Sequence, residues 1–357
     1  MRWLRHLSIG LLAAAVVGCA AGAGESRLGA PAPSPVTTPT DTGAPASPPA
    51  AARTVEKIVV ALPSAGGVFA PHYLAQQQGF FAEEGLEAEI AVMRGNLGPA
   101  GLASGQVHYT GTISGTVRDA INGVPHRVIA ATVDKSTRRL MAVPGISSVE
   151  QVRGKTIAVA AIGDGIYNSG VAALEQLGID PHSEVTWLQV GGIAERYLTL
   201  QQGGAQVSIF SGPEVPQAEA LGFRTVLHLN DVAPLPESGL STHLTTLETK
   251  PQQVRQVLRA MVRSLQFLKS NRGGSLPVFA QLLGVTPEEA APVYDAMLFA
   301  YSADGTLSER ALRFTIESEK RQLKYDGEVS PAAVADFGPL YQVLGELGVT
   351  PAADSAR

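Results

Sequence analysis

The sequence of 357 residues predicts an α/β protein with two lobes, and three observations support this. Short β-branched strands alternate with glycine-terminated helices from Lys57 to Val133, as in a lobe built on a largely parallel sheet. The same alternation starts again after Pro144 and Gly145. Beyond Val254 the apolar spacing is helical only, so we expect these last helices to pack back on the first lobe.

The elements of the first lobe follow from their composition and from the signals at their ends. Residues 57–62 predict a strand, and a helix from Phe69 to Gln78 is ended by Gly79. The remaining elements are strands over 87–92, 107–110 and 128–133, with helices over 99–104 and 114–122.

The second lobe begins with a capping box, in which Ser148 is followed three residues later by Gln151. Its further elements are strands over 156–160, 185–190 and 207–210, and helices over 168–177 and 193–202. In the helical region beyond, one apolar stripe has helical spacing, and it comprises Val254, Leu258, Met261, Leu265 and Leu268. A capping box at Thr286 and an amphipathic pattern over 308–324 predict two more helices.

The N-terminus has the features of a targeting segment. Arg2 and Arg5 precede an apolar run over 7–17, which is too short to cross a bilayer of about 30 Å. The small residues before Cys19, the sole cysteine, resemble the lipobox of bacterial lipoproteins. We therefore expect a signal peptide over 1–18 and a diacylglycerol on Cys19. An ordinary signal peptide or a chance cysteine is the alternative.

Residues 19–54 predict a tether between this lipid and the folded part. They are mostly Ala, Pro, Ser, Thr and Gly, and such a segment cannot bury enough apolar surface to offset its ordering entropy. The prolines keep the chain extended at roughly 3 Å per residue.

Composition excludes several classes of function. The net charge of −5 and the lack of a basic block make nucleic acid an improbable partner. With one cysteine the body has no disulfide and no thiolate metal site, and no cofactor is expected. Enzyme motifs are missing too: Gly163 and Gly165 lack the third glycine of a dinucleotide fingerprint, and no two histidines are spaced like zinc ligands.

Several segments resemble the substrate-binding proteins of ABC transporters, in the nitrate/sulfonate/taurine and thiamine-precursor-like branch. The segments are QGFFAEEGL at 78–86, LASGQV at 102–107, ISSVEQVRGKTIAV at 146–159, LEQLGIDP at 174–181 and EALGF at 219–223. The resemblance extends over about 55–347, and the order and spacing of the segments make it specific.

This resemblance implies a type II periplasmic-binding-protein-like fold, in which two crossing strands join the lobes and a solute is trapped between them. The crossings are expected near 142–145 and 227–233. Lobe 1 is then 55–143 plus 234–350, lobe 2 is 144–233, and 351–357 is a tail. A monomer in the periplasm or at the cell surface, anchored by lipid and delivering its solute to an ABC permease, is what the family implies.

Candidate ligand-binding residues lie where strands end and helices begin. Ligands of open α/β sheets bind outside the carboxyl ends of the strands, where helix N-termini present free N–H groups. Glycine, serine and asparagine in these places also serve as plain turn and cap residues. The candidates are Ser64, Phe69, His72, Asn96, Thr112, Ser114, Tyr167, Asn168, Ser211 and Glu214.

Some questions remain open at this stage. His108 and Ser208 stand where the family usually has Asp, and the change alters either the preferred ligand charge or, as we favour, only a structural hydrogen bond. Enzymes of the thiamine-pyrimidine or menaquinone-pathway type resemble this fold, and a ligand-sensing module for a receptor or a non-ABC transporter is a further alternative. The solute and the membrane that holds the anchor are undetermined.

Overall fold

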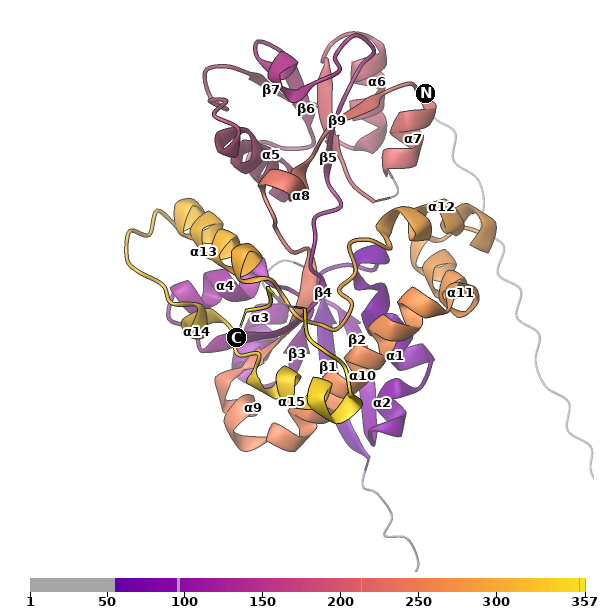
Figure 1. The fold of residues 1–357 in the computed structure, drawn as a ribbon, viewed down its shortest axis with the longest axis vertical. Coiled ribbons are helices and arrows are strands. Elements are labelled where there is room, and N and C mark those ends of the chain that lie inside the picture. Colours follow the sequence, from indigo (N-terminus) through magenta and orange to yellow (C-terminus); the bar gives the residue numbers. More distant parts are fainter. Residues whose placement is uncertain (1–54, 95–96, 213, 353, 357) are drawn as a thin grey trace, which may run out of the picture. The chain divides into compact units, whose positions relative to one another are not determined.

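The computed structural model describes residues 55–94, 97–212, 214–352 and 354–356 (Figure 1). The described residues belong to one compact unit. The expected signal peptide, the lipidation of Cys19 and the tether lie outside these residues. Within the described ranges, no helix combines the length and the apolar character needed to cross a membrane.

The sheet of the first lobe has the strand order β2-β1-β3-β10-β4. β1 pairs in parallel with β2 and β3, whereas β10 is antiparallel to β3 and β4. Val60 of β1 lies opposite Ile90 on one side and Tyr109 on the other. The strands are β1 (Glu56–Leu62), β2 (Leu86–Val92), β3 (Tyr109–Thr110), β4 (His126–Val133) and β10 (Ser238–His243).

The sheet of the second lobe repeats this plan with the order β7-β6-β8-β5-β9. Here β6 is parallel to β7 and β8, and β5 is antiparallel to β8 and β9. Each sheet is therefore mostly parallel with one reversed strand, which confirms the predicted fold class. The strands are β5 (Arg139–Ala142), β6 (Thr156–Val159), β7 (Thr186–Gln189), β8 (Val207–Phe210) and β9 (Arg224–His228).

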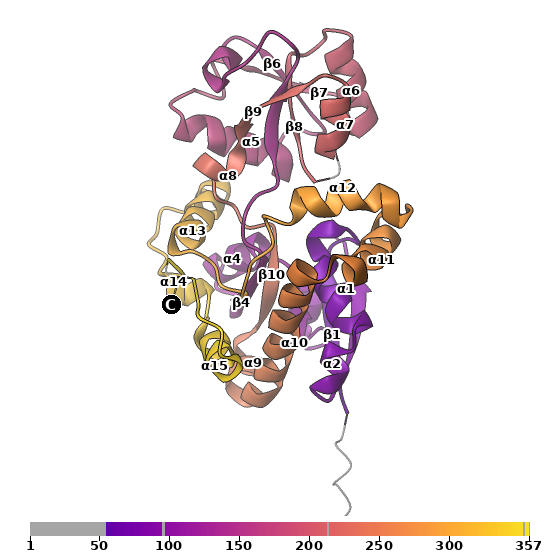
Figure 2. The same ribbon diagram turned by 45° about the vertical axis from the view of Figure 1, so that its right-hand side comes forward.

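Helices flank both sheets (Figures 1 and 2). Lobe 2 carries η2 (Val149–Val152), α5 (Gly165–Gln176), α6 (Ile193–Gln201), α7 (Glu214–Ala220) and α8 (Leu229–Val232). The N-terminal part of lobe 1 carries η1 (Gly67–Phe69), α1 (Ala70–Gln77), α2 (Phe80–Glu83), α3 (Leu97–Ser104) and α4 (Ser114–Ile121). The C-terminal helices are α9 (Leu244–Thr249), α10 (Pro251–Ser270), α11 (Arg272–Leu283), α12 (Pro287–Met297), α13 (Glu309–Leu323), α14 (Pro331–Val334) and α15 (Gly338–Leu347).

The C-terminal helices complete the core of lobe 1, as expected. Leu258 of α10, Ile316 of α13 and Leu340 of α15 are buried in one cluster with Ile58 of β1. All five residues of the predicted stripe on α10 are buried. The helical spacing of apolar residues therefore identified the inner face of the longest helix.

The first crossing between the lobes lies earlier in the chain than predicted. Residues 139–142 form β5 of the second sheet, so the chain leaves lobe 1 over 134–138, between β4 and β5. The second crossing is 233–237, because α8 still packs on lobe 2 through Leu229. Val143, Pro144 and Gly145 only form the turn after β5. Their turn composition had suggested a boundary there.

The segment expected to be a tail packs on lobe 1. Ala356 is buried, and its N–H donates to Leu307 O at 2.7 Å. Tyr341 Oη donates to Ala356 O at 2.6 Å. These two bonds tie the end of the chain to α15 and to the loop before α13.

Gly239 offers a test of the packing between β10 and its neighbours. A Cβ there would lie 2.5 Å from Ala130 O and 2.6 Å from Ile113 Cγ1. We expect Gly239→Ala to lower the free energy of unfolding by about 1–3 kcal/mol, and the thermal midpoint by several degrees. Gly345→Ala is the control, because nothing lies within 4 Å of its Cβ and alanine favours the helix. Equal midpoints for Gly239→Ala and the wild type would contradict the packing described.

Candidate functional site

A cavity of about 390 Å³ lies between the two lobes beside the crossing segments. Lobe 1 lines it with the loops after β1 and β3 and with one face of α13. Lobe 2 contributes the start of α5, and the second crossing contributes Leu235, Pro236 and Glu237. The cavity therefore lies at the carboxyl ends of parallel strands, where a ligand of an open α/β sheet is expected.

Two helix N-termini border the cavity. α4 starts at Ser114, and no side chain caps its first N–H groups. α5 differs, because its N-cap Asp164 accepts a hydrogen bond from Tyr167 N at 2.7 Å. The uncapped start of α4 therefore has free donors for an acceptor or anionic group of a ligand.

An ion pair joins α4 to α13 at the cavity wall. Arg118 Nε donates to Glu319 Oε2 at 2.8 Å, and Arg118 Nη2 donates to Gln322 Oε1 at 3.0 Å. Burial raises the pKa of Glu319, and the Arg118 guanidinium opposes that rise. The donors of Arg118 are thus largely engaged within lobe 1.

The carboxylate of Glu237 ties the two crossing segments together. Its Oε1 accepts from Ser136 Oγ at 3.1 Å and from Thr137 N at 2.8 Å, and its Oε2 accepts from Thr137 Oγ1 at 2.9 Å. The backbone adds a bond from Glu237 N to Val133 O at 2.9 Å. Because Glu237 also lines the cavity, it belongs both to the hinge and to the cavity wall.

Arg138 places a cation in the cavity wall. Its side chain is half-buried, and its backbone carbonyl accepts from Leu229 N at 3.0 Å. Across the part of the chain that the structure describes, the Arg138 guanidinium makes no hydrogen bond and no ion pair. It can therefore offer a fork of donors to an anionic or carbonyl group of a solute.

Four of the sequence-predicted residues line this cavity. Phe69, Thr112 and Ser114 come from lobe 1, and Asn168 comes from α5 in lobe 2. Their contact with a ligand stays a prediction, but the fold brings them together from three separate segments. Asn96, a fifth candidate, lies outside the described residues.

Three other candidates are placed elsewhere. Ser64 is exposed in the loop after β1 and does not line the cavity. Tyr167 packs edge-on against Trp187, with ring centroids 4.7 Å apart. His72 is fully buried on α1, and its Nε2 donates to Gly239 O at 2.9 Å. A histidine on the inner face of a helix is a core residue here and cannot reach a solute.

Ser211 and Glu214 stabilise the loop after β8 and do not line the cavity. Glu214 Oε1 accepts from Arg196 Nη2 at 3.2 Å, and Glu214 Oε2 accepts from Ser211 N at 3.1 Å. Arg196 is itself buried and donates to Ile209 O at 2.5 Å. The prediction at these two positions correctly located a strand end, but the Glu214 carboxylate is already hydrogen-bonded to Arg196 and Ser211.

The sequence analysis missed the charged residues of the wall. Arg138 and Glu237 belong to the crossing segments, and a polar run from Asp134 to Arg138 between two apolar strands was an available signal for the first of them. Glu319 lies on α13, more than eighty residues from the other cavity segments, and nothing in its surroundings in the sequence indicated a site.

His108 and Ser208 have structural roles. Val59 N donates to His108 Nδ1 at 3.0 Å, and Ser208 Oγ donates to Ala158 O at 2.8 Å. Neither residue lines the cavity between the lobes. Both residues thus make a hydrogen bond to a neighbouring strand, and a structural role for the two departures from the family pattern stays our prediction.

The burial of His72 predicts a pH dependence of stability. Desolvation lowers the pKa of His72 from 6.5 to about 4. The unfolded chain binds the proton first, so the stability due to the neutral imidazole is complete above pH 6.5 and is lost as the pH falls towards 4. The loss is about 3 kcal/mol over this range.

We expect His72→Gln, which can keep a donor near Gly239 O, to remove this loss. Urea unfolding of both proteins from pH 4 to pH 7 measures the difference. If the variant and the wild type lose stability in parallel, another group is responsible.

Comparison with known proteins gives one family and one shared fold. The family model described as NMT1/THI5 like matches residues 67–272. The riboflavin-binding protein RibY of Chloroflexus aurantiacus is 24% identical over 356 residues, covering 88% of this chain and 92% of that protein.

Several solved structures share the fold. The periplasmic sulfonate-binding protein SsuA of Methylobacillus flagellatus is 15% identical with a TM-score of 0.68, covering 85% of this chain and 99% of that chain. SsuA of Escherichia coli is 14% identical with a TM-score of 0.63, covering 79% of this chain and 92% of that chain. The desulfurization enzyme DszB is 14% identical with a TM-score of 0.58, covering 82% of this chain and 99% of that chain. Because the family model matches more than half of the sequence, this chain belongs to the NMT1/THI5-like family.

Proposed function

We propose that this protein captures a small solute between its lobes and delivers it to an ABC importer. The observation that carries the proposal is the cavity whose wall combines both lobes and a crossing segment. A solute bound there contacts lobe 1 through Thr112 and Ser114 and lobe 2 through Asn168. Its affinity is highest when both walls are engaged, so binding favours the closed arrangement by the difference in affinity.

The wall favours a solute with an acceptor or anionic group. Arg138 has free donors, and the uncapped start of α4 adds backbone N–H groups. Phe69 and Ile113 supply apolar surface beside them. SsuA is named for sulfonates and RibY for riboflavin, so the names of similar proteins point to different solutes. The solute of this chain therefore has to be inferred from the residues of its own cavity wall.

The role we propose is binding without chemical conversion. DszB shows that the fold also supports an enzyme. In the described part of the chain, however, no hydroxyl that lines the cavity is hydrogen-bonded to a histidine; Ser169 Oγ, for example, donates to Ile166 O at 2.8 Å. An activated hydroxyl nucleophile needs such a base beside it. The sole cysteine is Cys19, far from the cavity in sequence.

The location we propose is the extracytoplasmic face of a membrane. Lipid on Cys19 and the proline-rich segment after it would keep the domain near a permease while leaving it free to move. Tethering of this kind suits the delivery of a solute to a transporter.

A ligand screen on the domain from Val55 onward tests capture. A solute at 100 times its Kd adds about 2.7 kcal/mol of stability, or roughly 5–10 °C in the thermal midpoint for a domain of this size. We expect the same solute to reduce the radius of gyration in small-angle scattering. Recovery of the solute unaltered supports binding, whereas a converted solute supports an enzyme. A stabilising solute that leaves the radius unchanged contradicts closure.

Arg138→Gln tests the wall cation. Loss of a charge-assisted hydrogen bond is expected to weaken the binding of an anionic hit tenfold to a hundredfold. Arg224→Gln is the matched control, since Arg224 is exposed on β9 of lobe 2 and does not line the cavity. Isothermal titration of both variants makes the comparison. Equal affinities for the two variants would remove Arg138 from the site.

A further inference from the structure

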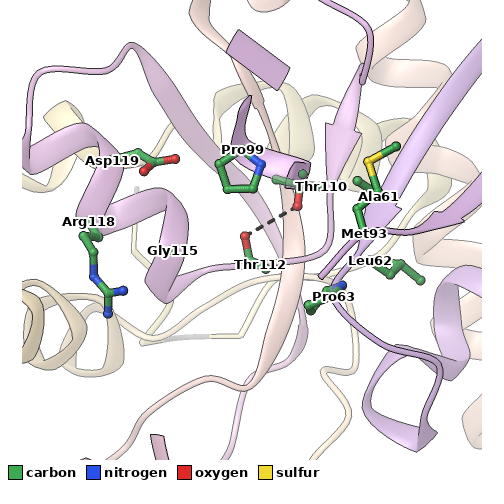
Figure 3. Close-up of a pocket in the computed structure, with 11 residues that line it drawn as sticks. Ala61, Leu62, Pro63, Met93, Pro99, Thr110, Thr112, Gly115, Arg118 and Asp119 are labelled. Atoms are coloured by element: carbon green, nitrogen blue, oxygen red, sulfur yellow. Dashed lines mark hydrogen bonds between the residues drawn. The ribbon is translucent and has the colours of Figure 1, made fainter. Parts of the chain in front are cut away.

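A second cavity, of about 270 Å³, lies within lobe 1 next to the first (Figure 3). It is bordered by the end of β1, by Met93 after β2, and by the facing starts of α3 and α4. Pro63, Thr112, Gly115 and Arg118 line both cavities, so the two spaces adjoin across these residues.

The second cavity is more apolar than the first. Leu62, Pro63, Met93 and Pro99 form its walls around the Thr110 and Thr112 hydroxyls, whose oxygens lie 3.5 Å apart (Figure 3). Polar groups on the α4 side are already engaged. Arg118 pairs with Glu319, and Asp119 Oδ2 lies 2.9 Å from His126 Nδ1. By contrast, the wall of the first cavity includes the guanidinium of Arg138, which has no partner among the residues that the structure describes.

We propose that the second cavity is a subsite for the apolar end of the solute, a ring system or a chain, whose polar end lies beside Arg138. This inference rests on the proposed function. An apolar cavity of about 150 Å³ holds one benzene ring. The second cavity is nearly twice that size, so two fused rings or a chain of several methylene groups match it.

This division into two spaces specifies the class of solute. An inorganic anion or a two-carbon sulfonate fills only the polar cavity, so no part of it contacts the apolar side chains of Met93 and Pro99. A solute with a polar head and an apolar tail fills both cavities, and the tail gains the free energy of burial against apolar walls. Thr112 then lies beside the junction of head and tail, because its side chain borders both spaces.

The test uses probes that share a head and differ in their tails. We choose n-alkanesulfonates and n-alkanoates with tails from one to eight carbons, naphthalenesulfonate as a two-ring probe, and riboflavin. Isothermal titration with the domain from Val55 onward is expected to show affinity rising by roughly fourfold for each methylene that enters the cavity. Naphthalenesulfonate is expected to bind at least tenfold more tightly than methanesulfonate.

Met93→Trp places a large side chain in the second cavity. We expect this variant to bind long-tailed and two-ring probes no better than one-carbon probes, while its affinity for one-carbon probes stays that of the wild type. Val92→Trp is the matched control, because Val92 is the preceding residue, is exposed and borders neither cavity. Pro99→Phe fills the same space from α3. It provides an independent test of the subsite if Met93→Trp does not fold.

The outcomes separate the two proposals. Binding that does not depend on the tail, or an equal loss for short and long probes in Met93→Trp and Pro99→Phe, overturns the subsite and leaves capture between the lobes intact. If no probe with either head binds the wild type, both the subsite and the proposed function are overturned. Tail-dependent affinity that the filled variants abolish and Val92→Trp retains establishes the subsite.

Discussion

The hydrogen bonds of the Glu237 carboxylate to Ser136 and Thr137 are the constraint on which the rest of the arrangement depends. They join the two chain segments that connect the lobes, 134–138 and 233–237. A carboxylate that accepts from a backbone N–H and from hydroxyls makes stronger bonds than neutral groups would. The relative position of the two sheets therefore depends on a small polar cluster, which also forms part of the cavity wall.

The reversed strand of each sheet explains why the cavity lies where it does. β10 enters the first sheet and β5 enters the second, each directly after a crossing, and each is antiparallel to both its neighbours. The other strands then have their carboxyl ends at the edge that faces the crossing. Loops after these ends provide Pro63, Thr112 and Gly163, so the topology alone collects residues from distant parts of the sequence. The side chains there decide only which solute fits.

Periodicity and turn residues predicted the alternating elements and the buried face of α10, because those features reflect local backbone preferences and burial on one side. Strand β10 was not predicted, because its residues Ser238–His243 are small or polar apart from Leu240 and lack a β-branched run. It is nevertheless a buried strand, paired with β3 on one side and β4 on the other. It also misplaced the first crossing, because Pro144 and Gly145 mark a turn inside lobe 2. For the cavity, strand ends identified Phe69, Thr112, Ser114 and Asn168. The charged wall residues depend on tertiary pairing, and a single sequence does not encode that pairing locally.

Lobe 2 is one uninterrupted stretch of chain, from β5 to α8, inserted into lobe 1. Its two ends leave lobe 1 side by side, because Glu237 N is bonded to Val133 O and Leu229 N to Arg138 O. A genetic exchange of this stretch between relatives would therefore replace one wall of the cavity as a single unit. Both points of exchange would lie in adjacent, hydrogen-bonded positions of the chain. The apolar space near Met93 and the C-terminal helices would pass through such an exchange unaltered. This insertion provides a route by which the two walls of the cavity can evolve at different rates.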